Sequence, residues 1–340
     1  MTSVDSDLGS PRPPASSGRR RREPAFAALD LGTNNCRLLV ATPAPGGFRV
    51  IDAFSRIVRL GEGVGASGVL SEAAMERAID ALRICAAKIR RQGVARARAV
   101  ATEACRRAGN CQDFVDRTRR ATGLDLEIIS SGEEARLSLT GCAPLLESSW
   151  PWALVFDIGG GSTELSWTRL VEGRPEIEGS ISLPLGVVTL GERFPQGDDD
   201  AQAYADMVAE VDGYLDPFDA DHGISARLEE GSVQMLGSSG TVTTLAGVHL
   251  NLPRYDRNRV DGYRLAFDAI EEVTRRIADM PVDERERHPC IGRERADLVL
   301  AGCAILEAIC RRWPVGTVRV ADRGVREGIL LALMEKEAQA

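Results

Sequence analysis

The amino-acid sequence predicts an α/β protein in which two similar domains face each other across a cleft. A strand-like run ending in Asp157 is followed by three glycines and an S-T-E triplet. With its aspartate aligned on Asp157, the stretch 28–38, A-L-D-L-G-T-N-N-C-R-L, matches V-F-D-I-G-G-G-S-T-E-L at 155–165. A duplicated loop, in a chain of 340 residues that is long for one core, indicates two related domains.

The glycines of these loops indicate phosphate binding. Glycine lets the backbone turn through positive φ and lets amide N–H groups approach an anion without a Cβ in the way. A third loop, G-S-S-G-T at 237–241, precedes a predicted helix, where free N–H groups also favour an anion. The loops match neither the G-x-x-x-x-G-K-[ST] motif of P-loops nor the G-x-G-x-x-G motif of dinucleotide-binding turns.

The first half reads as three strands followed by alternating helices and strands. Apolar residues recur every three or four positions from Met75 to Ile89, which predicts an amphipathic helix capped by Ser71 and ended by Gly93. We expect strands at 26–31, 37–41, 48–60, 98–102 and 126–129, and a further helix at 111–122.

The second half repeats this order after a turn at Trp150 and Pro151. We expect strands at 153–156, 164–168, 176–183, 232–236 and 315–321. Helices are expected at 187–194, 200–216, 242–249, 267–280, 294–312 and 325–337.

Composition excludes several classes of protein. A formal net charge of −8 argues against general nucleic-acid binding, and no run of about 18 apolar residues is present to cross a membrane. The eight cysteines form no C-x-x-C pair and the three histidines are far apart, so a zinc site is not expected and the thiols are those of a reduced, cytoplasmic protein. Residues 1–24 read as a disordered basic tail.

Charge is unevenly distributed along the chain. Residues 83–120 hold eleven Lys or Arg and three Asp or Glu. Solvated helix faces explain such a segment, and a border of a site for a polyanionic substrate is the alternative.

Several motifs together resemble the exopolyphosphatase/guanosine pentaphosphate phosphatase (Ppx/GppA) family. They occur in the family's order and cover about residues 26–333. The motifs are A-L-D-L-G-T-N-N-C-R-L-L-V, A-T-E-A-C-R-R-A-G-N, E-I-I-S-S-G-E-E-A-R-L, V-F-D-I-G-G-G-S-T-E-L and G-S-S-G-T-V-T-T-L-A, followed by E-R-A-D-L-V-L-A-G and V-A-D-R-G-V-R-E-G-I-L.

This resemblance implies the fold of actin, sugar kinases and Hsp70 (ASKHA), with two ribonuclease H-like domains. We place them at 25–148 and 149–340, with the last helix packing back on the first domain. It also implies removal of the terminal phosphoryl group from inorganic polyphosphate or guanosine pentaphosphate with Mg²⁺, or Mn²⁺ in its place. The chain lacks the helical C-terminal region of long members, so a short form is expected.

The resemblance also assigns roles to individual residues. Glu134 matches the glutamate that activates the attacking water, while its neighbour Glu133 is expected in the first turn of a helix. Arg106 matches an arginine that grips the phosphate. Asp157, Glu164 and Asp30 are the expected carboxylates near the metal. The expected phosphate cradle comprises Gly32, Thr33, Asn34, Asn35, Gly160, Gly161, Ser162 and Thr163, with Gly237, Ser238, Ser239, Gly240 and Thr241 as further contacts.

Two other functions remain open from the sequence. A kinase or ATPase of the same superfold shares the two phosphate loops, and a non-catalytic sensor of guanosine polyphosphates shares the binding chemistry. The first loop is commonly G-S-N-S in the family and is G-T-N-N here, which puts an amide at Asn35 and leaves the preferred substrate open. A homodimer is a further expectation, from the apolar C-terminal helices and the family's habit.

Overall fold

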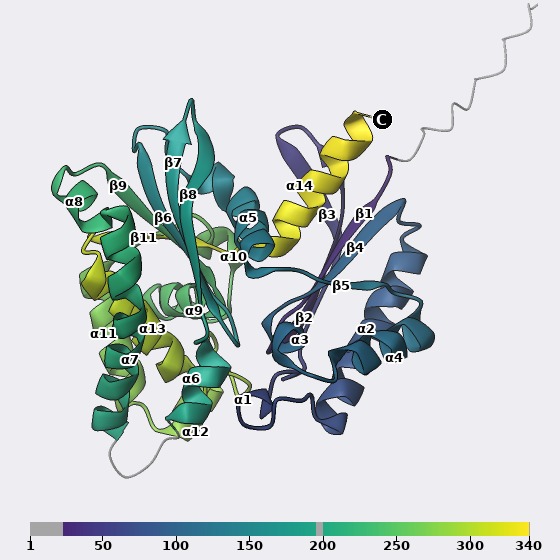
Figure 1. Cartoon of the computed structure of the whole chain (residues 1–340), viewed down its shortest axis with the longest axis horizontal. Helices are drawn as coiled ribbons and strands as arrows, with labels where there is room; N and C mark the ends of the chain where they lie inside the picture. Colours follow the sequence, from purple (N-terminus) through teal and green to yellow (C-terminus); the bar gives the residue numbers. More distant parts are fainter. Residues whose placement is uncertain (1–22, 195–199, 340) are drawn as a thin grey trace, which may run out of the picture.

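The computed structural model describes residues 23–194 and 200–339, and shows two α/β lobes (Figure 1). The predicted basic tail falls almost wholly outside the described residues. Among those that are described, no helix combines the length and apolar character needed to cross a bilayer.

The first lobe is built on a five-stranded sheet in the order β3-β2-β1-β4-β5. β1, β2 and β3 form an antiparallel meander, and β4 and β5 add in parallel beside β1. The strands are β1 (Phe26–Leu31), β2 (Asn35–Ala44), β3 (Gly47–Ile57), β4 (Arg96–Ala101) and β5 (Leu126–Ile128). Its helices are α1 (Val64–Ser67), α2 (Glu72–Arg91), α3 (Glu103–Arg107), α4 (Cys111–Thr122) and α5 (Ser131–Cys142), which the 3₁₀ turn η1 (Ala143–Leu145) follows.

The second lobe repeats this topology, with one strand added at the edge. Its sheet order is β10-β11-β9-β6-β7-β8, in which β6, β7 and β8 form the meander, β9 and β11 run parallel, and β10 pairs antiparallel with β11. The strands are β6 (Trp152–Ile158), β7 (Thr163–Val171), β8 (Arg174–Leu183), β9 (Val233–Ser239), β10 (Arg264–Ala266) and β11 (Thr317–Ala321). Its helices are α6 (Val187–Arg193), α7 (Asp200–His222), α8 (Ile224–Glu229), α9 (Gly240–His249), α10 (Arg257–Val260), α11 (Phe267–Asp279), α12 (Val282–Arg287) and α13 (Val299–Arg312). The matching strand orders confirm the expected duplication and the ASKHA-type fold.

The last helix, α14 (Val325–Ala338), lies against the first lobe, although it follows β11 of the second. Its residues Val325, Ile329 and Leu330 share a buried cluster with Phe26 of β1 and Leu39 of β2. α14 also crosses α5, so these two helices lie between the lobes (Figure 1). The contact is backbone to backbone, because a Cβ on Gly141 would collide with the Gly324 carbonyl, and one on Gly328 with the Leu137 carbonyl.

Local sequence signals explain most element boundaries. The Ser71 hydroxyl accepts a hydrogen bond from the Ala74 amide (3.2 Å), which confirms the predicted cap of α2. Helix α7 differs from expectation, since it continues through Pro217 to His222. The predicted third loop at 237–241 is not a loop, because β9 runs to Ser239 and α9 begins at Gly240. α13 starts at Val299 rather than at 294, and its apolar residues are buried in the second lobe.

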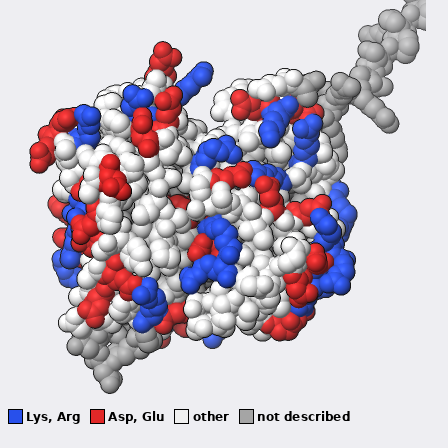
Figure 2. All heavy atoms as spheres, viewed as in Figure 1, with Lys and Arg blue, Asp and Glu red and all other residues white. Residues whose placement is uncertain are grey.

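The basic segment at 83–120 has mostly local partners. Lys88 and Arg91 bind Asp52, Arg98 binds Glu127, and Arg117 binds Glu72. Figure 2 shows basic and acidic side chains interleaved over much of the visible surface, including the first lobe. This pairing favours solvated helix faces over a polyanion-binding surface.

Candidate active site

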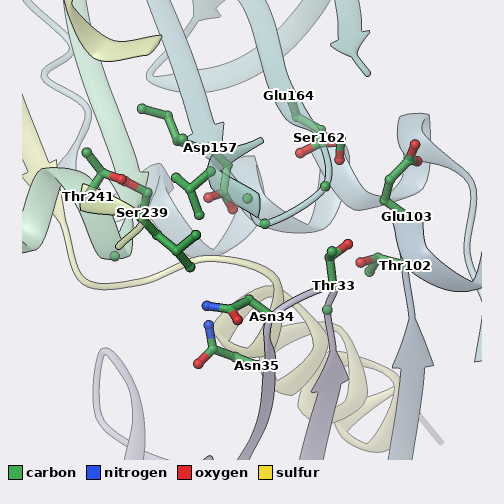
Figure 3. Close-up of a pocket in the computed structure, with 18 of the residues that line it drawn as sticks. Thr33, Asn34, Asn35, Thr102, Glu103, Asp157, Ser162, Glu164, Ser239 and Thr241 are labelled. Atoms are coloured by element: carbon green, nitrogen blue, oxygen red, sulfur yellow. The ribbon is translucent and has the colours of Figure 1, made fainter. Parts of the chain in front are cut away.

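A cavity of about 120 Å³ lies where the two duplicated loops meet. Thr33, Asn34 and Asn35 enter it from the first lobe, opposite Asp157 and Ser162 of the second (Figure 3). The other site residues predicted from the sequence that line this cavity are Asp30, Gly32, Glu134, Gly160, Gly161, Glu164, Ser239, Gly240 and Thr241. The structure thus brings together most of the residues that the sequence singles out.

The glycines of the second loop are explained by close packing rather than by positive φ. None of Gly159, Gly160 and Gly161 has a positive φ angle, contrary to the reason inferred from the sequence. Instead, a Cβ on Gly160 would lie 3.0 Å from the Asn34 amide nitrogen, and one on Gly161 would collide with the Thr33 hydroxyl. The two loops therefore touch directly, and only glycine fits between them.

Four of the predicted residues do not line this cavity. Thr163 was expected in the phosphate cradle, but its hydroxyl donates to the Leu185 carbonyl (2.7 Å) inside the second lobe. Gly237 was expected there too, but this glycine instead leaves room for the Phe156 ring, which a Cβ would contact at 2.5 Å. The Ser238 hydroxyl turns toward the segment before α14 and donates to the Arg323 carbonyl (2.6 Å). The fourth is Arg106, which acts from behind the lining residues.

Arg106 is held by carboxylates from both lobes. Its NH1 donates to Glu134 Oε2 (2.7 Å), its Nε donates to Glu103 Oε2 (3.0 Å), and its NH2 lies 3.8 Å from Glu164 Oε1. α3 supplies Glu103 and Arg106 in its single turn, and α5 supplies Glu134 in its first turn. The arrangement places a guanidinium among three carboxylates at one end of the cavity.

Glu133 lies beside this group but has a structural role. Its amide donates to the Ser130 hydroxyl (3.2 Å), which caps α5, and its carboxylate accepts from Arg98 (2.7 Å). The first-turn position expected for Glu133 is confirmed.

The carboxylates of the cavity are buried together, and this raises their pKa values. Burial and the nearby Glu164 charge raise the pKa of Glu134 to about 8. Burial raises the pKa of Asp157 to about 7, with a contribution from Glu134. Burial likewise raises the pKa of Glu164 to about 7, despite hydrogen bonds from Ser162 (2.7 Å) and Ser182 (3.0 Å). The lining places five acidic side chains beside two arginines, Arg37 and Arg295; the acidic residues are Asp30, Glu103, Glu134, Asp157 and Glu164.

This charge surplus fits a divalent cation. Asp157 and Glu164 face each other in the β6–β7 register, so their side chains lie on the same side of the sheet. Within residues 23–194 and 200–339, no group of three or more His, Cys, Asp or Glu could hold a metal by itself. Mg²⁺ needs no such group, because it usually takes one or two carboxylates together with waters and substrate phosphate oxygens.

Two buried polar atoms of the cavity lining make no hydrogen bond. They are Thr33 Oγ1 and Asn34 Oδ1. Burying a polar group without a partner costs about 1–3 kcal/mol, so atoms of this kind gathered at one place indicate a missing ligand.

Glu103 and Arg37 are among the lining residues that sequence reasoning missed. Glu103 precedes Arg106 by three positions in T-E-A-C-R-R, a spacing that pairs side chains on a helix. Arg37 aligns with Glu164 in the duplicated motif, and pairs with Asp30 in the β1–β2 register as Glu164 pairs with Asp157. The repeat could have revealed Arg37.

Comparison with known proteins identifies similar sequences and folds. The sequence profile described as the Ppx/GppA phosphatase family matches residues 39–337. Exopolyphosphatase 2 of Mycobacterium tuberculosis is 32% identical over 321 residues, covering 90% of this chain and 98% of that protein. A guanosine-5'-triphosphate,3'-diphosphate pyrophosphatase of Aeromonas salmonicida is 29% identical, covering 92% of this chain and 60% of that protein. The crystal structure of an Aquifex aeolicus Ppx/GppA protein superposes with a TM-score of 0.76 at 30% identity, covering 93% and 99% of the two chains.

Proposed function

The chain belongs to the Ppx/GppA phosphatase family, and on that premise we propose that it removes the terminal phosphoryl group from a polyphosphorylated substrate. The substrate class is inorganic polyphosphate or guanosine pentaphosphate, which are the substrates implied by the names of its relatives. Water attacks the terminal phosphorus, the phosphoanhydride bond breaks, and orthophosphate leaves together with the shortened substrate. The observation that carries this proposal is the position of Glu134, which binds Arg106 and lines the same cavity as the two phosphate loops.

Glu134 is the general base of the proposed reaction. A carboxylate with a pKa near 8 is a better proton acceptor than one with an ordinary pKa, and approach of a cation would restore its charged form. Arg106 holds one oxygen of Glu134, and its NH2 pairs with Glu103 (2.9 Å), so its positive charge stabilises the reacting phosphate from behind the lining carboxylates. Phosphoryl transfer has a loose transition state, so positioning and charge stabilisation supply most of the catalysis.

The loops bind the phosphoryl oxygens. Thr33 Oγ1 and the Asn34 and Asn35 side chains face the second loop across the cavity, so the transferred group lies between them. Mg²⁺, or Mn²⁺, would be held by Asp157, Glu164 and Asp30 with the substrate oxygens, and would neutralise charge on the phosphates.

Replacing Glu134 by Gln tests the proposal most directly. The amide keeps the size of the side chain but cannot accept the proton, so we expect kcat for phosphate release to fall roughly 10²- to 10⁴-fold. The measurement is orthophosphate release from tripolyphosphate, long polyphosphate, guanosine pentaphosphate and ATP, with Mg²⁺ and after chelation. The matched control is Glu133→Gln, a change at the neighbouring residue in the first turn of α5, for which kcat should stay within about threefold.

Other outcomes would favour the alternatives. A Glu134→Gln enzyme with kcat near the unmodified value would remove Glu134 from the mechanism. ATP-dependent phosphorylation of a small molecule without orthophosphate release would indicate a kinase. Tight binding of guanosine polyphosphates without turnover in Mg²⁺ would indicate a sensor.

A further inference from the structure

A second cavity, of about 460 Å³, adjoins the active-site cavity and has a basic lining. It lies between β2 and β3 of the first lobe, the start of α9 in the second, and the segment 321–326 that leads into α14. We call it the basic cavity, because its charged lining residues are five arginines and three aspartates. They are Arg37, Arg257, Arg295, Arg323 and Arg326, with Asp30, Asp157 and Asp322.

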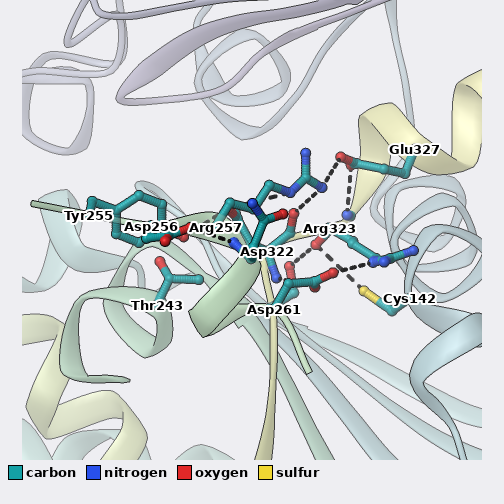
Figure 4. A network of polar contacts seen from close by, with 12 residues as sticks. Cys142, Thr243, Tyr255, Asp256, Arg257, Asp261, Asp322, Arg323 and Glu327 are labelled. Carbon is teal, nitrogen blue, oxygen red and sulfur yellow. Dashed lines mark hydrogen bonds and ion pairs between the residues drawn. The ribbon is translucent and has the colours of Figure 1, made fainter. Parts of the chain in front are cut away.

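Two of the five arginines are already paired within the protein. Arg257 donates to the Asp322 carbonyl (2.6 Å) and to Glu327 Oε1 (3.1 Å), and Arg323 Nε donates to Asp261 Oδ2 (2.7 Å). Figure 4 shows these side chains as one network around the segment that precedes α14. Their contacts hold this segment in place and use their charge for structure.

The other three arginines have no such partner. Within the part of the chain that the structure describes, no carboxylate lies within 4 Å of the guanidinium groups of Arg37, Arg295 and Arg326. Arg295 donates to a hydroxyl, Thr244 Oγ1 (3.2 Å). Burial lowers the pKa of Arg326, and the nearby charge of Arg37 adds to this effect. Charged groups withdrawn from water are normally paired, so three guanidinium groups without a direct partner around one cavity indicate an anion.

Two helices also present their N-terminal ends to the basic cavity. α9 begins at Gly240 and α14 begins at Val325, and both residues line the cavity. The N-terminal end of a helix carries a partial positive charge and favours bound anions. These helix ends add to the attraction that the arginines provide.

The basic cavity is continuous with the active-site cavity. Arg37, Arg295 and Ser239 line both, so a small anion passing from one to the other stays in contact with the same positive groups and hydroxyl. Glu134 and Glu103 line the active-site cavity and not the basic one, so the end at which water attacks lies apart from this passage.

We propose that the basic cavity binds the orthophosphate that the reaction releases, as a separate site from which this product departs. The proposal rests on the proposed function, because each turnover would produce one orthophosphate in the adjoining cavity. A tetrahedral anion has oxygens enough to accept hydrogen bonds from several guanidinium groups at once. With such a site, orthophosphate can leave the active-site cavity before the shortened substrate dissociates.

The two cavities differ in a way that binding experiments can separate. Five acidic side chains line the active-site cavity, so a phosphate there needs a cation, whereas the basic cavity needs none. Calorimetry with inorganic orthophosphate in EDTA should therefore show one bound anion per chain. Arg326→Gln should weaken this binding at least tenfold, since Arg326 lines the basic cavity and not the active-site cavity. The matched control is Arg293→Gln, at an exposed position two residues before Arg295, which should change it less than twofold.

A second variant avoids the interior of the protein. Ser55 is exposed on β3, lines the basic cavity and pairs with Arg37 in the β2–β3 register. Ser55→Glu places a carboxylate beside Arg37, where it would repel an anion without disturbing buried packing. We expect this change to weaken orthophosphate at least tenfold in EDTA, which keeps the proposal testable if Arg326→Gln unfolds.

Product inhibition provides a readout during turnover. With tripolyphosphate and Mg²⁺, added orthophosphate should inhibit the unmodified enzyme, and Arg326→Gln should raise the inhibition constant at least tenfold. Arg293→Gln should change it less than twofold.

Three results would overturn the proposal. They are no orthophosphate binding in EDTA, unchanged affinity in both Arg326→Gln and Ser55→Glu, and equal weakening of orthophosphate and of tripolyphosphate measured with Mg²⁺ in the Glu134→Gln background. The last result would mean that the substrate chain occupies the basic cavity. Failure of the proposed function looks different, because the unmodified enzyme would then release no orthophosphate from any substrate, whatever binds in EDTA.

Discussion

At the scale of single residues, Glu134 and Arg106 show how one ion pair can serve both structure and chemistry. Arg106 donates to Glu134 Oε2 and also to the Ile129 carbonyl (3.0 Å), at the end of β5. These bonds fix the direction of the carboxylate before any substrate arrives. Preorganised charges of this kind cost no rearrangement during the reaction.

Asp52 is a second residue whose charge depends on its neighbours, at a place unconnected with catalysis. It lies on β3, where it accepts hydrogen bonds from Lys88 (2.6 Å), Gln92 (3.0 Å) and Arg91 (2.7 Å) at the C-terminal end of α2. These contacts, with that of Lys88 the largest, hold the pKa of Asp52 well below its ordinary value. The charged form therefore stabilises the folded state above the unfolded pKa.

We predict that Asp52→Asn lowers the free energy of unfolding by about 1 kcal/mol at pH 7. Because the folded pKa is depressed, this stabilisation is present above about pH 4 and is lost as the pH falls below it. Urea unfolding of both proteins at a series of pH values checks this, and the two curves should converge in acid. Asp125→Asn, which breaks the exposed pair with Arg119, is the control and should change stability by less than about 0.5 kcal/mol at any pH.

At the scale of elements, the crossing of α5 and α14 sets the geometry between the lobes. We predict that Gly141→Ala destabilises the protein by about 1–3 kcal/mol, since the new methyl group meets the backbone of Gly324 and neither helix can yield cheaply. Thermal and denaturant unfolding measure the effect.

Gly132→Ala, in the same helix, is the matched control. A Cβ there meets nothing within 4 Å, so the higher helix propensity of alanine should leave stability equal or slightly increased. Equal destabilisation by the two changes would show that backbone approach is not what Gly141 provides.

Regular elements were the part of the fold most accessible from sequence. β1 and α4 begin and end where the sequence predicts, because the apolar periodicity and the residues at their ends indicate the same bounds. The one-turn helix α3 was not predicted, since five residues are too few to show a period. The G-S-S-G-T stretch was read as a loop, but the β6–β9 pairing extends the strand to Ser239.

The site was predictable where the repeat marked it, and not where it depends on packing. The duplicated aspartates identified Asp30 and Asp157, and both line the cavity. Thr163 was included because it belongs to the motif, but in a strand successive side chains face opposite ways, so Thr163 faces the core while Glu164 faces the cavity. Glu103 acts through Arg106, a contact that sequence spacing alone does not distinguish from a surface pair.

At the scale of the whole molecule, the cavity between the two lobes is lined by more acidic than basic side chains. A cation and a phosphate chain bound between the lobes would bind the folded state and not the unfolded chain, and so raise the melting temperature.

We therefore predict that Mg²⁺ with tripolyphosphate raises the Tm of the Glu134→Gln protein by several degrees, and that EDTA removes the effect. Adding Asp157→Asn should abolish the Mg²⁺-dependent part of the shift, whereas adding Asp268→Asn, in the first turn of α11, should leave it unchanged. A shift of the same size with EDTA present would exclude the metal from binding.

The position of α14 also has a consequence for how the protein is made. One face of the first sheet, including Phe26 and Leu39, is covered by Ile329 and Leu330. During translation, β1 leaves the ribosome early, whereas α14 follows only when nearly the whole chain has been synthesised. Although N-terminal domains generally fold first, this one cannot bury that face until the second lobe has been synthesised. The nascent chain thus leaves the part of this apolar sheet surface that α14 covers exposed during most of its translation.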